Sequence, residues 1–232
     1  QAYGSGEGYS LVSFFGKLNY TYDDKYLLSM TVRRDGSSRF GKNNRYATFP
    51  SFSLGWRLNR EKFMQNLGWI DDLKVRGSWG QTGNQSGLGD YSYLASYSIN
   101  RVQWFGEGFD TNAVPTRTQS TLSNPELTWE TTSQTDIGLD LTMFNNRLML
   151  YIDWYYKRTS DMLMTITLPA GSAPARTLNY NGGTMVNKGW EITLKSVNMK
   201  GKFSWDTDFN ISFNKNKLES LRLTQVYYSA MT

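Results

Sequence analysis

Asp206 and Asp208 are separated by one residue, a spacing at which two carboxylates can offer oxygen ligands to a calcium ion. The residues around them alternate between polar and apolar, and in an extended chain every second side chain points to the same face. Both aspartates then belong to the polar face of one strand, together with Ser204, Asn210 and Ser212. This placement accounts for the pair without a metal ion, so we predict no metal site.

The glycine-rich residues 80–90 are a second candidate for chemistry, as a phosphate-binding loop. No helical pattern follows them, and the Lys-Ser or Lys-Thr pair of such loops is missing. The chain also has no histidine and no cysteine, which removes a Ser–His–carboxylate triad, a thiolate metal site and a disulfide framework. We therefore predict no catalytic residues, no cofactor and no enzymatic activity for these 232 residues.

A long connection, residues 84–117, is the strongest candidate for ligand binding. It carries aromatic rings next to amide and guanidinium donors, a combination that suits sugars or peptides. In the alternative interpretation, these aromatic residues pack the loop against itself or against a partner. The residues that we expect to contact a ligand are Tyr91, Tyr97, Arg101, Gln103 and Trp104.

The elements that must position these residues are strands, because eight segments alternate between apolar and polar residues. In FPSFSLGWRL, for example, Leu54 and Trp56 share one face of an extended chain, while Ser53 and Arg57 share the other. The eight segments span residues 12–22, 26–35, 49–58, 73–79, 127–143, 148–159, 190–195 and 203–213.

Short and long connections alternate along the chain, so one end of the predicted sheet carries tight turns and the other carries long loops. The exception is residues 59–72, where we expect a turn with one short helix that Asn59 caps. The other connections are tight turns at 23–25, 145–146 and 198–201, a loop of intermediate length at 36–46, and long loops at 82–126 and 162–188.

The tight turns fix the register of the hairpins around them. A two-residue turn at Asn145-Asn146 suits a type I′ conformation, because asparagine tolerates the positive φ angles that it requires. A three-residue turn at 23–25 sets a second hairpin in the same way. In both hairpins apolar residues then face apolar residues and polar residues face polar ones. The predicted pairs are Leu139–Ile152, Gln134–Lys157, Tyr20–Leu28 and Leu18–Met30.

The apolar face could be buried, as in a soluble sandwich, or could face lipid, as in a membrane barrel. Several segments have about 10 or more residues, longer than the roughly five to six of average strands and long enough to cross a bilayer when tilted. The net charge of +5 has no basic block, which suits an anionic lipid surface better than nucleic acid. Aromatic residues recur near segment ends, like the girdles of membrane barrels, at Tyr20, Tyr22, Tyr26, Trp129, Phe144, Tyr156 and Trp190.

We therefore favour a barrel, and keep a soluble β-sandwich carbohydrate-binding module as the alternative. In a barrel the polar faces line the lumen. Arg33, Arg39 and Arg45, near the connection 35–45, are expected to be solvated or ion-paired rather than bound to lipid phosphates. The residues predicted to line the lumen are Arg33, Arg57, Arg76, Glu130, Asp136, Asp140, Asp153, Lys157, Glu191 and Lys195.

Four stretches of the chain resemble, in order, consecutive barrel segments of the SusC/RagA family of TonB-dependent outer-membrane transporters of Bacteroidota. The stretches are RRDGSSRFGKNNRYATFPSFSLGWRLNREKF (33–63), DDLKVRGSWGQTGN (71–84), NPELTWETTSQTDIGLDLTMFNNRL (124–148) and NKGWEITL (187–194). The resemblance covers nearly the whole chain, and its first stretch is long and specific. It implies an all-β, antiparallel transmembrane β-barrel segment, with about eight strands of a plugged barrel of roughly 22 strands.

The resemblance also implies a function and its partners. Residues 1–232 would be part of a single TonB-dependent receptor β-barrel domain, with the plug and the TonB box expected to lie outside this sequence. The implied function is import of an oligosaccharide or a peptide across the outer membrane, with a SusD-like surface lipoprotein as a lid and TonB acting from the periplasm. An outer-membrane enzyme is disfavoured by the missing histidine.

One expectation separates a slice of a large barrel from a small closed barrel. A closed eight-stranded barrel has an interior that is filled by side chains, which does not suit charged inner faces and two long loops. We therefore expect residues 11–22 and 203–214 not to pair with each other.

Overall fold

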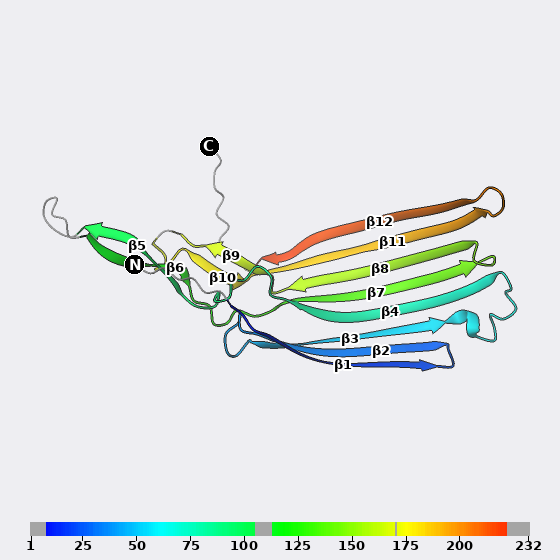
Figure 1. The fold of residues 1–232 in the computed structure, drawn as a ribbon, viewed down its shortest axis with the longest axis horizontal. Helices are drawn as coiled ribbons and strands as arrows, with labels where there is room; N and C mark the ends of the chain where they lie inside the picture. The colour runs from blue at the N-terminus through cyan, green and yellow to red at the C-terminus, as the bar shows by residue number, and fades with distance from the viewer. Residues whose placement is uncertain (1–7, 105–112, 170, 222–232) are drawn as a thin grey trace.

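The computed structural model describes residues 8–104, 113–169 and 171–221, with the backbone alone for residues 99–104 and 113–116. Within these ranges the chain is almost entirely extended (Figure 1). Its elements are β1 (Leu11–Tyr22), β2 (Tyr26–Ser37), β3 (Tyr46–Arg57), η1 (Leu58–Arg60), β4 (Ile70–Asn84), β5 (Ser96–Trp104), β6 (Ala113–Leu122), β7 (Glu130–Met143), β8 (Leu148–Ser160), β9 (Leu163–Thr167), β10 (Thr177–Asn181), β11 (Gly183–Met199) and β12 (Trp205–Leu221).

Eight long strands form one antiparallel sheet in the order β1-β2-β3-β4-β7-β8-β11-β12. Each strand pairs with its neighbour in this order, and the tight turns gather at one end of the sheet while the long connections leave from the other (Figure 1). Within the described residues, β1 pairs only with β2 and β12 only with β11, as expected for a slice of a larger wall. The predicted all-β fold with about eight barrel strands is confirmed.

The hairpin registers are also confirmed, although one turn differs from the prediction. Leu139 lies opposite Ile152 and Gln134 opposite Lys157. The other hairpin has the predicted pairs Tyr20–Leu28 and Leu18–Met30.

The turn between β7 and β8 is longer than the predicted two-residue type I′ turn. Its first residue, Phe144, has a φ of 58°, followed by Asn145 at 56° and Asn146 at 60°. The backbone N–H of Phe144 donates to the Trp69 carbonyl, and the two rings stack with centroids 6.1 Å apart. This contact holds a bulky residue in the left-handed region, where it is otherwise strained.

The outward face of the eight-stranded sheet is apolar across its whole width and has no covering layer among the described residues. Leu54, Ile137 and Phe209 are each more than half exposed. A soluble sandwich would bury this face against a second sheet, so the structure disagrees with that alternative. One row of directly paired residues crosses all eight strands: Tyr22, Tyr26, Trp56, Val75, Leu139, Ile152, Ile192 and Ile211.

The hydrophobic core lies at the end of the sheet where the long connections begin. Phe40, Phe49, Leu88, Leu127 and Trp129 are buried against one another there. The indole N–H of Trp129 donates to the carbonyl of Arg45. The prediction that Trp129 belongs to a membrane-facing aromatic girdle is therefore wrong, because loop residues cover its ring.

A second sheet was not predicted from the sequence. The two long connections contribute β5 and β6, and β9 and β10, to a four-stranded sheet in the order β5-β6-β10-β9, which extends beyond the end of the large sheet (Figure 1). The connections meet where β10 pairs in parallel with β6, Thr177 opposite Thr121. Residues 82–126 and 162–188 are thus two parts of one structure rather than independent loops.

Asparagine side chains attach this second sheet to the roots of the long strands. Asn181 accepts from the backbone N–H of Thr128 and donates to the carbonyls of Thr128 and Asp161. Asn124 donates to the carbonyl of Asn179. These bonds satisfy backbone groups that leave the strand ladders at this end.

The connection after β3 begins with the single 3-10 turn η1 (Leu58–Arg60), whereas a short helix capped by Asn59 was predicted. The Asn59 side chain instead donates to the carbonyl of Asp71, and Phe63 is 66% exposed, so no core contact stabilises a longer helix. None of the helical segments in the described ranges has the length and apolar composition needed to cross a membrane.

Candidate functional site

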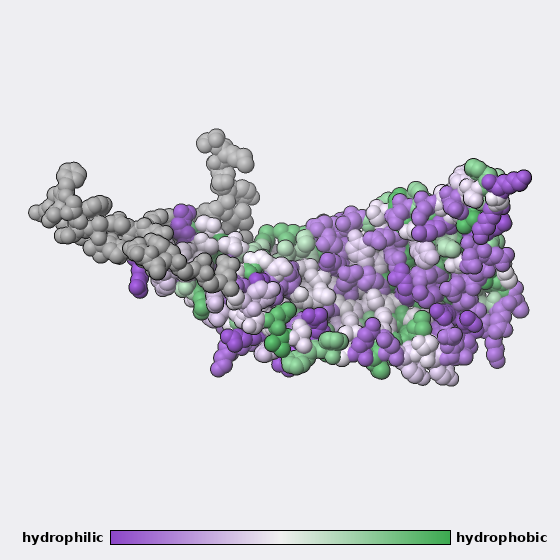
Figure 2. All heavy atoms as spheres, in the orientation of Figure 1, coloured by the Kyte–Doolittle hydropathy of each residue, from purple (hydrophilic) through white to green (hydrophobic). Residues whose placement is uncertain are grey.

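The polar face of the eight-stranded sheet carries the charged residues that the sequence marked out. The strand registers place all ten on the face opposite the uncovered apolar rows. Figure 2 shows one face of the molecule, on which hydrophilic side chains predominate over the long strands. The ten residues are Arg33, Arg57, Arg76, Glu130, Asp136, Asp140, Asp153, Lys157, Glu191 and Lys195. That this face lines a lumen stays a prediction.

Four charged side chains form one network in the middle of this face. Arg76 Nε lies 3.0 Å from Asp140 Oδ1, and its Nη2 lies 2.5 Å from Asp153 Oδ1. Lys74 Nζ lies 2.7 Å from the other Asp140 oxygen. Two cations and two anions therefore balance. Lys74 was not among the predicted site residues, although its place opposite Asp140 follows from the strand register.

Glycine at position 138 makes this network possible. Gly138 stands between Arg76 and Asp153 in the row of paired residues. A Cβ at that position would lie 2.6 Å from both Arg76 Cζ and Asp153 Oδ1. Any other residue there would have to displace the ion pair, so the small residue is what lets a strand-to-strand bridge form across β7.

The remaining charges of this face are divided between local pairs and free groups. Arg33 Nε lies 2.7 Å from Asp35, and Lys195 Nζ lies 3.1 Å from Asp208. Asp136 accepts from the Ser78 hydroxyl and from the Gln134 amide. Three predicted residues have no side-chain ion pair among the described residues: Arg57, Lys157 and Glu191.

Glu130 has a different position from the other predicted residues. Its carboxylate accepts from the Asn84 amide at 3.0 Å and from the backbone N–H of Leu163 at 3.0 Å. It therefore holds the start of β9 to the end of the large sheet, which is a structural role at the junction of the two sheets.

A groove of about 440 Å³ runs along the polar face next to the charge network. Its floor consists of small residues, including Ser29, Ser53, Gly55 and Ser78, which expose hydroxyl and backbone groups. A second hollow of about 330 Å³ shares this floor and reaches Lys157. The two hollows together offer hydroxyl, amide and charged groups to a polar molecule.

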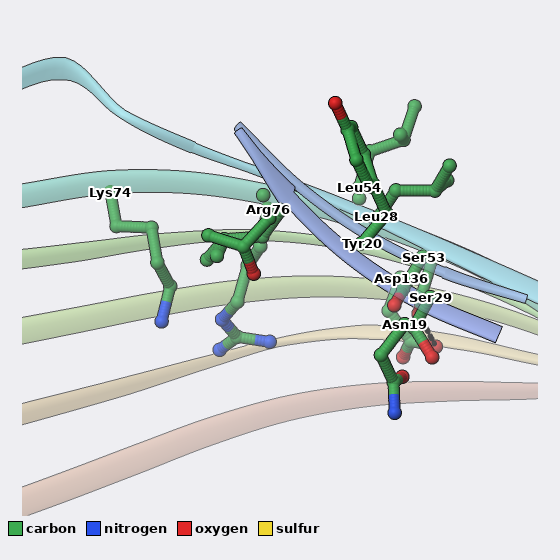
Figure 3. Close-up of a pocket in the computed structure, with 14 residues that line it drawn as sticks. Asn19, Tyr20, Leu28, Ser29, Ser53, Leu54, Lys74, Arg76 and Asp136 are labelled. Atoms are coloured by element: carbon green, nitrogen blue, oxygen red, sulfur yellow. Dashed lines mark hydrogen bonds between the residues drawn. The ribbon is translucent and has the colours of Figure 1, made fainter. Parts of the chain in front are cut away.

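Figure 3 shows how the strand pleat separates the two kinds of side chain around this groove. Lys74 and Arg76 project to one side of the ribbon, and Tyr20, Leu28 and Leu54 project to the other. One strand thus supplies a hydrogen-bonding inner surface and an apolar outer surface at the same time.

The predicted ligand-binding residues lie at the other end of the molecule, in and before β5. Tyr91 and Tyr97 are 58% and 59% exposed, so their rings are available to a ligand. Arg101, Gln103 and Trp104 belong to β5, but their side chains lie outside the described part of the structure. The ligand-binding prediction for these five residues stays a prediction.

Arg39 links this region to the connection after β2. Its guanidinium lies 3.1 Å from Asp90 and stands 4.0 Å from the ring centre of Tyr9. Of the three arginines expected to be solvated or ion-paired, Arg33 and Arg39 are ion-paired and Arg45 is exposed.

No group of three or more Asp and Glu side chains in the described ranges is arranged to hold a metal ion. Asp206 and Asp208, which were expected to share the polar face of one strand, both lie on the polar face of β12, and Asp208 pairs with Lys195.

Comparison with known proteins gives one consistent result. The family described as TonB dependent receptor-like, beta-barrel matches residues 1–228. The TonB-dependent receptor P26 of Formosa agariphila is 39% identical over 220 residues, and the TonB-dependent receptor SusC of Bacteroides thetaiotaomicron is 37% identical over 216 residues. These matches cover 92% and 91% of the chain but 21% of each relative, so the chain spans about a fifth of the relatives' length.

Solved structures show the same relationship. The RagAB peptide importer in its closed-closed state superposes with a TM-score of 0.82 at 32% identity, covering 96% of this chain and 24% of that chain. The siderophore receptor PirA from Pseudomonas aeruginosa has a TM-score of 0.56 at 13% identity, which is a likeness of fold alone.

Proposed function

Because the chain belongs to the TonB-dependent receptor β-barrel family, we propose that it forms part of the wall of a SusC/RagA-type transporter that imports a nutrient. Proteins of this family are outer-membrane β-barrels, and they are receptors and transporters rather than enzymes as a rule. The chain covers a fifth of its relatives, so import is a property of the complete receptor to which this wall segment contributes.

The observation that carries the proposal is the contrast between the two faces of one sheet. The outward face exposes Leu54, Ile137 and Phe209, and no other part of the described structure covers it, which suits lipid. The opposite face holds the Arg76–Asp140–Asp153 network and the serine-floored groove, which suit a polar path. A sheet with these two surfaces, and with two edges that have no partner strand among the described residues, is what a segment of a large transport barrel requires.

We propose an oligosaccharide or a peptide as the nutrient. A related structure is that of a peptide importer, and the serine, amide and charged groups around the groove can hydrogen-bond either class. At the end with the long connections, the exposed rings of Tyr91 and Tyr97 supply apolar faces for a sugar ring or a peptide side chain. Arg101, Gln103 and Trp104 would add donors from β5.

The proposed partners belong to the two ends of the barrel. A SusD-like surface lipoprotein would close the end with the long connections and the second sheet. TonB would act from the periplasmic side through parts of the receptor outside this chain. The single barrel domain proposed for residues 1–232 would include the second sheet as an extracellular extension of that wall.

Uptake by the complete receptor tests the proposal. A strain that lacks the receptor gene should fail to take up a fluorescent oligosaccharide or peptide, and the gene should restore uptake only when TonB is present. Tyr97→Ala should reduce uptake, whereas Tyr22→Ala, on the apolar face at the turn end, should leave it unchanged. Uptake that is independent of the receptor would overturn the transport proposal. Equal uptake by both variants would overturn the assignment of Tyr97.

A further inference from the structure

Two lysines lie directly opposite each other on the outward face of the sheet. Lys188 on β11 pairs in register with Lys215 on β12. Both are exposed, and neither has an ion pair among the described residues. Cross-strand neighbours have Cβ atoms about 4.5–5.5 Å apart, and like charges at this distance destabilise a sheet. A bound anion between the two ammonium groups would turn this repulsion into attraction.

The surroundings of the pair are unusually positive for the outward face. On β8, β11 and β12 this face carries four cations, Arg158, Lys188, Lys215 and Lys217, and one acid, Glu219. Glu219 is already engaged, because its carboxylate lies 3.2 Å from Arg158 Nε. The three lysines therefore keep their charge available to an external partner.

The position of the pair coincides with the border of the apolar band. On β12 the outward apolar residues run from Trp205 to Phe213, nine residues, which is close to the length of a tilted strand that crosses the hydrocarbon core. Lys215 is the next outward residue after Phe213. β11 runs in the opposite direction, so there Lys188 is the next outward residue beyond Trp190 toward the long connections. Trp190 pairs with Phe213. The two lysines thus stand about 6.6 Å beyond an aromatic pair of the kind that marks a membrane interface.

A groove connects the aromatic pair with the lysines. It has a volume of about 340 Å³ and is lined by Trp154, Trp190, Phe213, Lys188 and Lys215, together with Gly189 and Asn214. Trp190 and Phe213 are 50% and 57% exposed. One end of the groove is therefore cationic and the other is aromatic, which matches the phosphate group and the first part of an acyl chain of one amphipathic molecule.

We infer that Lys188 and Lys215 bind the phosphate headgroup of an anionic membrane lipid, with Trp190 and Phe213 in contact with its acyl chain. The lipid belongs to the leaflet next to the long connections, because the lysines lie on that side of the apolar band. Lys217 adds a further positive charge on the same strand. This inference concerns how the wall is held in the membrane and does not depend on which nutrient is imported.

Native mass spectrometry of the full-length receptor in mixed micelles tests the inference. The probes are phosphatidylglycerol, which is anionic, phosphatidylcholine, which is zwitterionic, and inorganic phosphate as a competitor. We expect the double variant Lys188→Gln/Lys215→Gln to bind phosphatidylglycerol about tenfold more weakly than the unchanged receptor, since each lysine near a membrane surface adds to the attraction of anionic lipids. Lys188→Arg/Lys215→Arg should keep the binding, because the charges remain.

The matched control is Lys200→Gln/Lys202→Gln, which removes the same charge at the turn between the same two strands. Each variant is first tested by electrophoresis for the heat-dependent mobility shift of a folded barrel. A loss of lipid binding can then be distinguished from a loss of folding. An equal loss in the control would mean a general charge effect and would overturn the site. Binding of phosphatidylcholine as strong as that of phosphatidylglycerol would also overturn the site. So would unchanged binding of phosphatidylglycerol in Lys188→Gln/Lys215→Gln, or displacement of phosphatidylglycerol by inorganic phosphate at the same concentration.

Discussion

Arg76 on β4 reaches Asp153 on β8 across an entire intervening strand, with Nη2 and Oδ1 2.5 Å apart. The two strands are not neighbours, because β7 lies between them. Glycine at position 138 of β7, opposite both residues, leaves the space that the pair occupies. One small residue thus couples three strands of the wall through a single guanidinium group.

Gly138→Ala should therefore destabilise the barrel although it adds only one methyl group. The new Cβ would lie 2.6 Å from Arg76 Cζ, so the ion pair must move apart. We expect a loss of about 1 kcal/mol in the free energy of unfolding, the upper range for a partly exposed ion pair, because the atoms that must move are the ends of two flexible side chains. Urea unfolding of the full-length receptor in liposomes measures it. Gly77→Ala is the control, because its Cβ would meet only an ordinary contact at 3.9 Å. Equal changes in the free energy of unfolding for the two variants would show that the ion pair does not depend on the space that Gly138 leaves free.

Arginine substitutions should distinguish the two faces of β3. Leu54 is 57% exposed on the apolar face, and a charge near mid-membrane on the lipid face of a barrel costs about 2–4 kcal/mol. Leu54→Arg should therefore reduce the amount of folded receptor in the outer membrane. Its neighbour Ser53 lines the groove on the opposite face, so Ser53→Arg should be milder. The measurement is the folded fraction by heat-modifiable electrophoresis, and equal tolerance at both positions would contradict the assignment of the faces.

The carboxylate of Glu61 should make the stability of the turn end of the sheet depend on pH. Its Oε1 accepts from the Tyr26 hydroxyl at 2.8 Å and from the Trp56 indole at 3.2 Å. These hydrogen bonds, first that of Tyr26 and then that of Trp56, lower the pKa of Glu61 below its ordinary 4.5. The ionised carboxylate therefore contributes stability that is fully present above about pH 4.5 and is lost as the pH falls through the lowered pKa of the folded state.

Glu61→Gln tests this relationship. The variant should be less stable than the unchanged receptor at pH 7, and the difference should shrink at acid pH, where the glutamate is protonated and resembles glutamine. Urea midpoints at the two pH values give the comparison. A difference that stays constant with pH would show that the carboxylate charge contributes nothing to this contact.

The buried and the membrane-facing tryptophans should respond differently to truncation. Trp129 is 5% exposed and packs against Phe40 and Phe49, with ring centroids 4.8 and 5.8 Å away. Trp129→Ala should cost about 3–5 kcal/mol, as for other large core residues. Trp190→Ala should cost less, because half of that side chain is exposed. Similar unfolding free energies for the two variants would contradict the core at the base of the long connections.

The long strands and two hairpin registers could be predicted because alternation and turn length are local properties. The pairing of Leu139 with Ile152 needs only the positions of the turn and of the apolar residues. Trp129 was misassigned because its place in the alternation is that of a girdle residue. The sequence does not reveal that Phe40 and Leu88, from two other connections, cover it.

The second sheet could not be predicted for a related reason. β9 and β10 have only five residues each. Thr177 on β10 pairs in parallel with Thr121, 56 residues away, a contact that no local pattern encodes. For the candidate site, the charged residues of the polar face could be found one strand at a time. Their organisation could not, because the link between Arg76 and Asp153 depends on the absence of a side chain at Gly138.

The most direct test of the central claim, that this sheet is a membrane wall with a polar inner face, compares two adjacent residues of β2. Leu28 lies on the apolar face and Ser29 lines the groove. Leu28→Cys and Ser29→Cys are introduced singly into a full-length receptor without other cysteines, labelled with a fluorophore, and placed in vesicles with brominated lipids. Lipid should quench the label at position 28 and leave the label at position 29 accessible to a water-soluble quencher. Quenching by lipid at position 29, or equal access of the water-soluble quencher to both positions, would contradict the claim.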